Sequence, residues 1–91
     1  MASYPAGTQF GDRQRFEEGS TFGSNCEFGS ECIFGENCKF RNGCRFGSHS
    51  KFVACQFQSA TFGNGCELTC PILNGKTKFG RDLILNGPVR T

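Results

Sequence analysis

Large apolar residues recur along the chain at nearly constant intervals. The interval is six residues from Phe10 to Phe52, five for the next two steps, and five or six from there to Thr91. Every phenylalanine in the sequence belongs to this key series. Its members are Phe10, Phe16, Phe22, Phe28, Phe34, Phe40, Phe46, Phe52, Phe57, Phe62, Leu68, Leu73, Phe79, Leu85 and Thr91.

A second series, mostly of small residues, precedes the key series by two positions, as at Cys26 and Ser50. The residue between the two series is usually polar, as at Glu27 and Lys51, so the side chains alternate inward, outward and inward, which predicts short β-strands. The glycines lie outside these three-residue units, where tight corners need positive φ. A helix is excluded, because a six-residue period drifts around a helix of about 3.6 residues per turn. Alternating strands and corners predict a β-solenoid.

The frame Phe-Gly-x-x-Cys-x occurs at residues 22–27 and again at residues 28–33. It resembles the hexapeptide repeat of left-handed β-helices, in which three hexads make one triangular coil. The resemblance implies an all-β fold, a triangular left-handed parallel β-helix in which the key positions form about five coils. We expect one solenoid domain at residues 7–91, preceded by a short N-terminal extension at residues 1–6.

Stacked coils would align every third key residue into a column. The hexapeptide family generally has Leu, Ile or Val at this position, whereas this chain has mostly phenylalanine. The five-residue steps to Phe57 and Phe62 are similar to those of pentapeptide-repeat proteins, which wind four-sided and right-handed, so a four-sided coil is the alternative. The columns of a three-sided coil are Phe10, Phe28, Phe46, Phe62 and Phe79; Phe16, Phe34, Phe52, Leu68 and Leu85; and Phe22, Phe40, Phe57, Leu73 and Thr91.

Charge and composition narrow the classes of partner. Ten Lys and Arg against eight Asp and Glu give a formal net charge of +2, which is too small for an electrostatic nucleic-acid clamp, so direct nucleic-acid binding is not expected. No apolar run approaches the ~18 residues that span a membrane. The first residues lack the basic and apolar regions of a signal peptide. We therefore expect a cytoplasmic protein that does not insert into a membrane.

Six of the seven cysteines occupy the small inward series, where Ser, Thr and Ala also occur. This pattern predicts free, buried thiols that act as small apolar residues, and an odd count in a cytoplasmic protein argues against disulfides. Cys70 alone falls outside the series and is expected at a corner, as the candidate reactive thiol. Cys66, Cys70 and His49 lack the second ligand pair of a zinc site, so no metal is expected.

His49 is the single histidine of the chain. Acyltransferases of the hexapeptide family use a coil histidine as general base, which makes His49 the candidate for such a role. The sequence offers it no recognisable acid–base partner, and the added loop or C-terminal helix that builds a substrate site in those enzymes is missing. We therefore predict an exposed corner histidine and a protein without catalytic residues or cofactor.

The two ends of the predicted solenoid differ in character. The first coil is polar, whereas the last carries Leu83, Ile84, Leu85 and Val89 beside strand edges that no further coil covers. We expect these four residues to form the interface of a homodimer in which two last coils meet end to end. A second candidate docking surface is one side face of the coil, formed by Ile33, Lys51, Glu67 and Ile84.

These observations favour a small non-enzymatic binding protein that acts through its solenoid surface, with a protein as its partner. By analogy with pentapeptide-repeat proteins, it would be an inhibitor that occludes a larger macromolecular machine, such as a nucleic-acid-handling or phage-defence enzyme. The alternatives are a small hexapeptide-type acyltransferase and a structural rod or tip protein.

Overall fold

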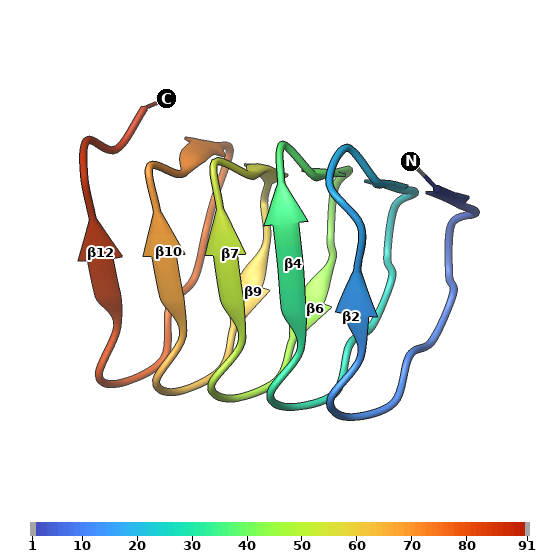
Figure 1. Ribbon diagram of the computed structural model, residues 1–91, viewed down its shortest axis with the longest axis horizontal. Helices are drawn as coiled ribbons and strands as arrows, with labels where there is room; N and C mark the ends of the chain where they lie inside the picture. The colour runs from blue at the N-terminus through green and yellow to red at the C-terminus, as the bar shows by residue number, and fades with distance from the viewer. Residues whose placement is uncertain (1, 91) are drawn as a thin grey trace.

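The computed structural model describes residues 2–90, which form short strands joined by tight corners (Figure 1). No helix that could cross a membrane occurs in this part of the chain. The strands are β1 (Ser3–Tyr4), β2 (Arg15–Phe16), β3 (Thr21–Phe22), β4 (Ile33–Glu36), β5 (Lys39–Phe40), β6 (Arg45–Phe46), β7 (Lys51–Val53), β8 (Gln56–Gln58), β9 (Thr61–Phe62), β10 (Glu67–Thr69), β11 (Ile72–Asn74) and β12 (Ile84–Asn86).

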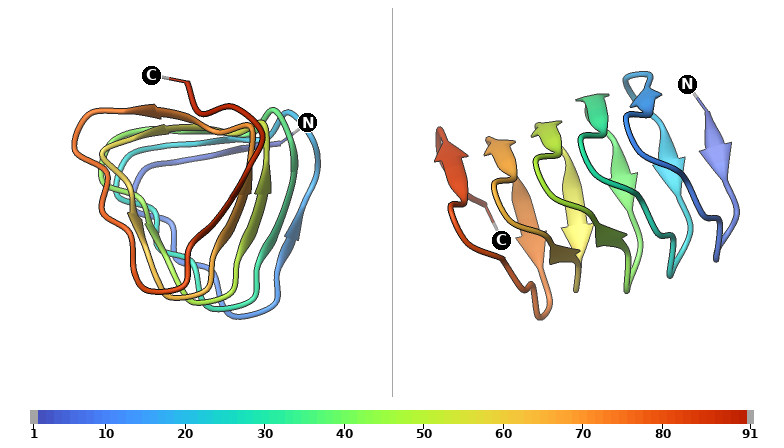
Figure 2. Two further views of the ribbon diagram at one scale, coloured as in Figure 1. Left: turned by 90° about the vertical axis from the view of Figure 1, so that its left-hand side faces the viewer. Right: turned by 90° about the horizontal axis from the view of Figure 1, so that it is seen from below.

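The strands stack into three parallel sheets that form the sides of a triangular prism (Figure 2). Face A consists of β1, β3, β5, β8 and β11, and face C of β2, β4, β7, β10 and β12. Face B consists of β6 and β9, extended at both ends by single bridges such as Gln9 with Glu27 and Thr61 with Lys78. The predicted all-β solenoid of about five turns is confirmed, and it has three sides.

The winding of the coil is right-handed. In Figure 1 the strands of face C rise at the front and β6 and β9 descend behind them, while the chain advances from right to left. Seen from the C-terminal end in Figure 2, the chain turns counterclockwise as it approaches the viewer. This corrects the left-handed coil that the hexapeptide resemblance implied. The six-residue period is the same in either hand, and right-handed connections between parallel strands are strongly preferred.

The coil also begins earlier than residue 7, where the sequence placed the start of the domain. Ser3 and Tyr4 of β1 pair with Thr21 and Phe22 of β3. The Tyr4 ring stacks on the Phe22 ring with the centroids 4.9 Å apart. Tyr4 therefore continues the aromatic series one six-residue step before Phe10.

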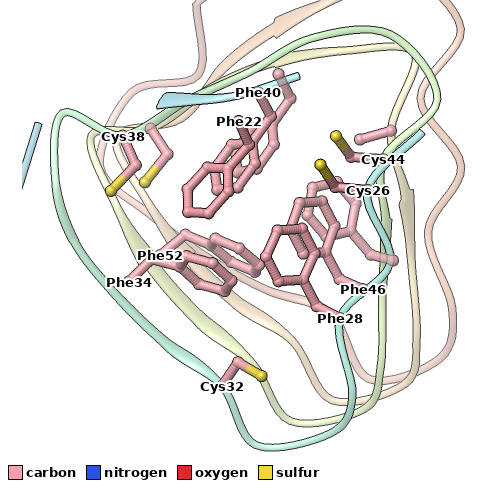
Figure 3. Close-up of a cluster of buried hydrophobic side chains, with 14 of the residues drawn as sticks. Phe22, Cys26, Phe28, Cys32, Phe34, Cys38, Phe40, Cys44, Phe46 and Phe52 are labelled. Atoms are coloured by element: carbon pink, nitrogen blue, oxygen red, sulfur yellow. The ribbon is translucent and has the colours of Figure 1, made fainter. Parts of the chain in front are cut away.

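Three aromatic columns fill the prism, as the three-sided arrangement predicts. Within a column the rings lie nearly parallel, as for Phe34 and Phe52, with centroids 4.6 Å apart and planes at 10°. Rings of different columns meet edge to face, as in Figure 3 for Phe28 and Phe34, whose planes form an angle of 81°. Every phenylalanine joins these columns, although Phe79, in the last coil, is 38% exposed. Thr91, expected in the third column, lies outside the described residues.

The glycines fill two different roles at the corners. Gly7, Gly19, Gly43, Gly65, Gly75 and Gly87 have positive φ, as predicted. The glycines that directly follow a key residue do not, which corrects that part of the prediction. Except for Gly11, they are needed because the chain there approaches the preceding coil closely: a Cβ on Gly47 would lie 2.6 Å from the Gly29 carbonyl carbon.

Candidate binding surfaces

The thiol groups of the interior are buried and hydrogen-bonded. All seven cysteines are free. In the six buried ones the Sγ–H group donates to a main-chain carbonyl of the preceding coil, at 3.4 Å from Cys44 to Gly23 and 3.4 Å from Cys66 to Gly47. The full set of donors is Cys26, Cys32, Cys38, Cys44, Cys55 and Cys66. These side chains therefore hold neighbouring coils together.

Burial also makes most of these thiols poor nucleophiles. It raises the pKa of Cys32 and Cys66, and it raises the pKa of Cys44 to about 11. The pKa of Cys55 is raised by its hydrogen bond with the stacked Cys38 thiol and by burial. Because the thiolate is the reactive form of cysteine, these four thiols are poor nucleophiles. The hydrogen bond from Cys55 lowers the pKa of Cys38 to about 7, but the Cys38 side chain is fully buried.

Cys70 and His49 both stand at corners, with φ of 48° and 59°. Cys70 is half-buried, and its Sγ lies 2.6 Å from the point where a Cβ on Gly87 would be. His49 is exposed and lies against Gly65 of the following coil in the same way. Within residues 2–90, no three His, Cys, Asp or Glu side chains come together as a metal site would require.

The docking surface predicted on face C is a single row of side chains. Strand pairing aligns Ile33 with Lys51, Lys51 with Glu67, and Glu67 with Ile84. Ile33 and Ile84 are 42% and 47% exposed, but two charged residues separate them. The predicted row exists, and its two isoleucines do not form a continuous apolar patch.

The C-terminal end of the prism exposes the open core. Leu85 and Val89 are each 44% exposed because no further coil covers them within residues 2–90, whereas Leu83 packs partly against the core. Ile84 points outward on face C rather than into the end. The predicted interface omitted Phe79, which belongs to the same open end. The sequence indicates this position, because Phe79 is the last phenylalanine of its column.

Face A carries a surface that the sequence did not single out. Its strands contain no Asp or Glu. Pairing places Lys39 beside Gln56, and Arg41 follows directly along β5. A shallow hollow of about 570 Å³ lies over this face, lined by the polar side chains of Thr21, Lys39, Arg41, Gln56, Gln58 and Asn74. These groups present cationic and amide donors to solvent, without a nearby carboxylate on the same strands.

Charge is also divided along the axis of the solenoid. Residues 1–36 contain six acidic and two basic side chains, whereas residues 37–91 contain eight basic and two acidic ones. The N-terminal coils are therefore acidic and the C-terminal coils basic, although the whole chain is close to neutral.

No family model matches the chain, and no curated protein and no solved structure resembles it significantly.

Proposed function

We propose that this protein is a non-enzymatic binding protein that uses face A to hold an acidic segment of a partner protein. The observation that carries the proposal is the acid-free row of cations and amides on β3, β5, β8 and β11, with a hollow of about 570 Å³ above it. Lys39 and Arg41 attract carboxylates, and the amides of Gln56 and Gln58 can donate hydrogen bonds to carboxylate or main-chain oxygens.

An acidic polypeptide fits this face better than a nucleic acid. The cations of face A are few, whereas an electrostatic nucleic-acid binder neutralises several phosphates with Lys and Arg side chains. The acidic coils at residues 1–36 would repel a polyanion that extended past face A toward the N-terminal end. The target we propose is thus an acidic surface on a larger protein, and occlusion of that surface is the proposed mode of action.

The reducing cytoplasm is the proposed compartment. Six buried cysteines remain free although their side chains stack in neighbouring coils, as Cys38 and Cys55 do. Thiols in such pairs persist where the redox poise is reducing. A structural rod is the second candidate function, and its support is the pair of open coil ends.

Titration with a hexaglutamate peptide tests the binding face. The peptide is added to ¹⁵N-labelled protein, and amide shifts are followed by NMR. We expect shifts confined to β3, β5 and β8 that weaken with added salt.

A double variant with Lys39→Glu and Arg41→Glu should abolish these shifts. The matched control, Arg45→Glu with Lys78→Glu on face B, changes the net charge equally and should retain them. Equal loss in both variants, or tighter binding of a single-stranded oligonucleotide than of hexaglutamate, would overturn the proposal.

A further inference from the structure

We propose that copies of this protein associate head to tail, with the C-terminal end of one copy on the N-terminal end of the next. The junction would continue the three sheets and the aromatic columns, and it would form independently of any ligand on face A. The competing arrangement is the two-fold dimer in which two last coils meet.

Strand direction favours the head-to-tail arrangement. Every strand pair in the described chain is parallel. Each end of the prism leaves the outer main-chain groups of one coil without a neighbouring coil, which is a template for a further strand. Copies stacked head to tail would extend these ladders in parallel, whereas a two-fold contact would make them antiparallel.

The columns also continue across such a junction. Phe79 is 38% exposed and, among the described residues, stacks only on Phe62, with centroids 5.3 Å apart. If the coils of the two copies continue in register, the next ring of this column is Phe10 of the following copy. Phe10 is itself only partly buried. Leu85 would likewise meet Phe16 of the following copy.

Charge distinguishes the two arrangements further. Contact between like ends sets basic coils against basic coils, whereas head-to-tail contact sets the basic end against the acidic one. The corners between faces B and C, which stack from coil to coil, show this charge complementarity in particular residues. Within the chain, the Arg13 Nε lies 3.3 Å from the Glu31 Oε1 one coil away. Across the junction, the same spacing would place Arg81 beside Asp12, and Asp82 beside Arg13, of the next copy.

Gly11 supplies an independent indication. It belongs to a row with Gly29, Gly47, Gly63 and Gly80, and in these four a Cβ would lie under 3.0 Å from an atom of the preceding coil. In the part of the chain that the structure describes, no coil lies before Gly11, its φ is not positive, and a Cβ there would meet nothing within 4 Å. The single chain therefore gives no reason for glycine at this position, whereas a second copy packed beneath it does.

The contact area predicts how strong the association is. The two shorter dimensions of the prism are 23 and 22 Å. One end therefore buries less than the ~800 Å² per partner of a typical stable complex. We expect a weak equilibrium that grows with concentration. Because head-to-tail contacts do not close, the mass should increase beyond that of a dimer.

Sedimentation velocity over a concentration series up to about 1 mM tests the proposal. The decisive variant is Gly11→Ala, whose added methyl group has open space in the monomer. It should retain the wild-type melting temperature in dilute solution and lose the association. Arg81→Glu should weaken association at least tenfold, and Asp12→Asn, which keeps an oxygen to accept the Ser30 N–H, should also weaken it.

Three outcomes would overturn the proposal. The first is a wild-type monomer at the highest concentration. The second is wild-type association of the Gly11→Ala variant. The third is a mass that stops at the dimer and responds to Arg81→Glu but not to Asp12→Asn, which would assign the contact to two C-terminal ends.

Discussion

Replacement of Phe34 by alanine tests the aromatic columns at their centre. Phe34 is 1% exposed, and its ring stacks between those of Phe16 and Phe52, with centroids 4.8 and 4.6 Å away. Buried Phe→Ala changes cost about 3–5 kcal/mol, because a cavity remains where the surroundings relax only in part. Each lost aromatic pair adds about 0.5–1.5 kcal/mol beyond burial, so we expect a loss near the upper end, about 4–5 kcal/mol.

The same substitution at Phe79 provides the comparison. Phe79 is 38% exposed and, in the part of the chain that the structure describes, stacks on a single ring, that of Phe62. Its side chain keeps contact with water in the native state, so Phe79→Ala should cost only about 1–2 kcal/mol. Lys39→Ala, an exposed position between Thr21 and Gln56, should stay within about ±0.5 kcal/mol.

Urea unfolding followed by circular dichroism measures these differences, with the free energy of unfolding obtained by linear extrapolation. The order of the losses should be Phe34→Ala, Phe79→Ala, Lys39→Ala. Equal losses of unfolding free energy at Phe34 and Phe79 would refute the reasoning. They would show that a ring stacked on both sides contributes no more stability than a ring stacked on one side.

Three further predictions concern glycines and thiols. Gly47→Ala should lower the melting temperature by several degrees, since its Cβ would meet Gly29 backbone at 2.6 Å, and an unchanged value would contradict the close approach of the coils. Under native conditions a thiol reagent should modify Cys70 fast and the six buried cysteines slowly, as read by intact mass; fast modification of several cysteines, or masses two hydrogens short per cysteine pair, would contradict this. Burial raises the pKa of Cys44 from 9.0 to about 11, so the unfolded chain loses this proton at a lower pH than the folded protein does. The stability that the neutral Cys44 thiol provides should therefore be fully present below pH 9 and decline between pH 9 and 11. Thermal unfolding of Cys44→Ala across that range should show a weaker decline than wild type, and an identical decline would argue against the shift.

The key series could be predicted from the sequence because its buried positions recur along the chain every five or six residues. Phe40 is buried and Lys39 exposed in β5, as the alternation requires. Cys44 and Ala60 are interchangeable in the inward series, because both fit the small space at a corner. Local alternation thus suffices to identify the strands and the burial of the cysteines, whereas the columns also require the number of sides of the coil, which the sequence leaves open between three and four.

Other features depend on distances between coils that no local pattern contains. Gly47 is required by the approach of Gly29, a residue eighteen positions away, rather than by its own φ. Tyr4 is the exception, because it lies one six-residue step before Phe10 and the period alone is enough to place it in the series. The hand of the coil is a property of the connections, and the period does not determine it.

The candidate surfaces were predicted only in part for the same reason. The open end follows from the apolar last coil, so Leu85 and Val89 could be predicted. The polar surface of face A combines outward residues such as Lys39 with Arg41 and Gln58, which occupy a position that is glycine in half of the repeats. These residues come together only when three coils are stacked.

The measurement that most directly tests the three-sided coil is a set of nuclear Overhauser contacts between main-chain protons of neighbouring coils. The structure pairs Thr21 with Lys39, and Arg45 with Thr61. Contacts between the amide and Hα protons of these pairs are the predicted result. A four-sided coil would bring together every fourth key position, so contacts joining Thr21 to Arg45 in place of Lys39 would contradict the account.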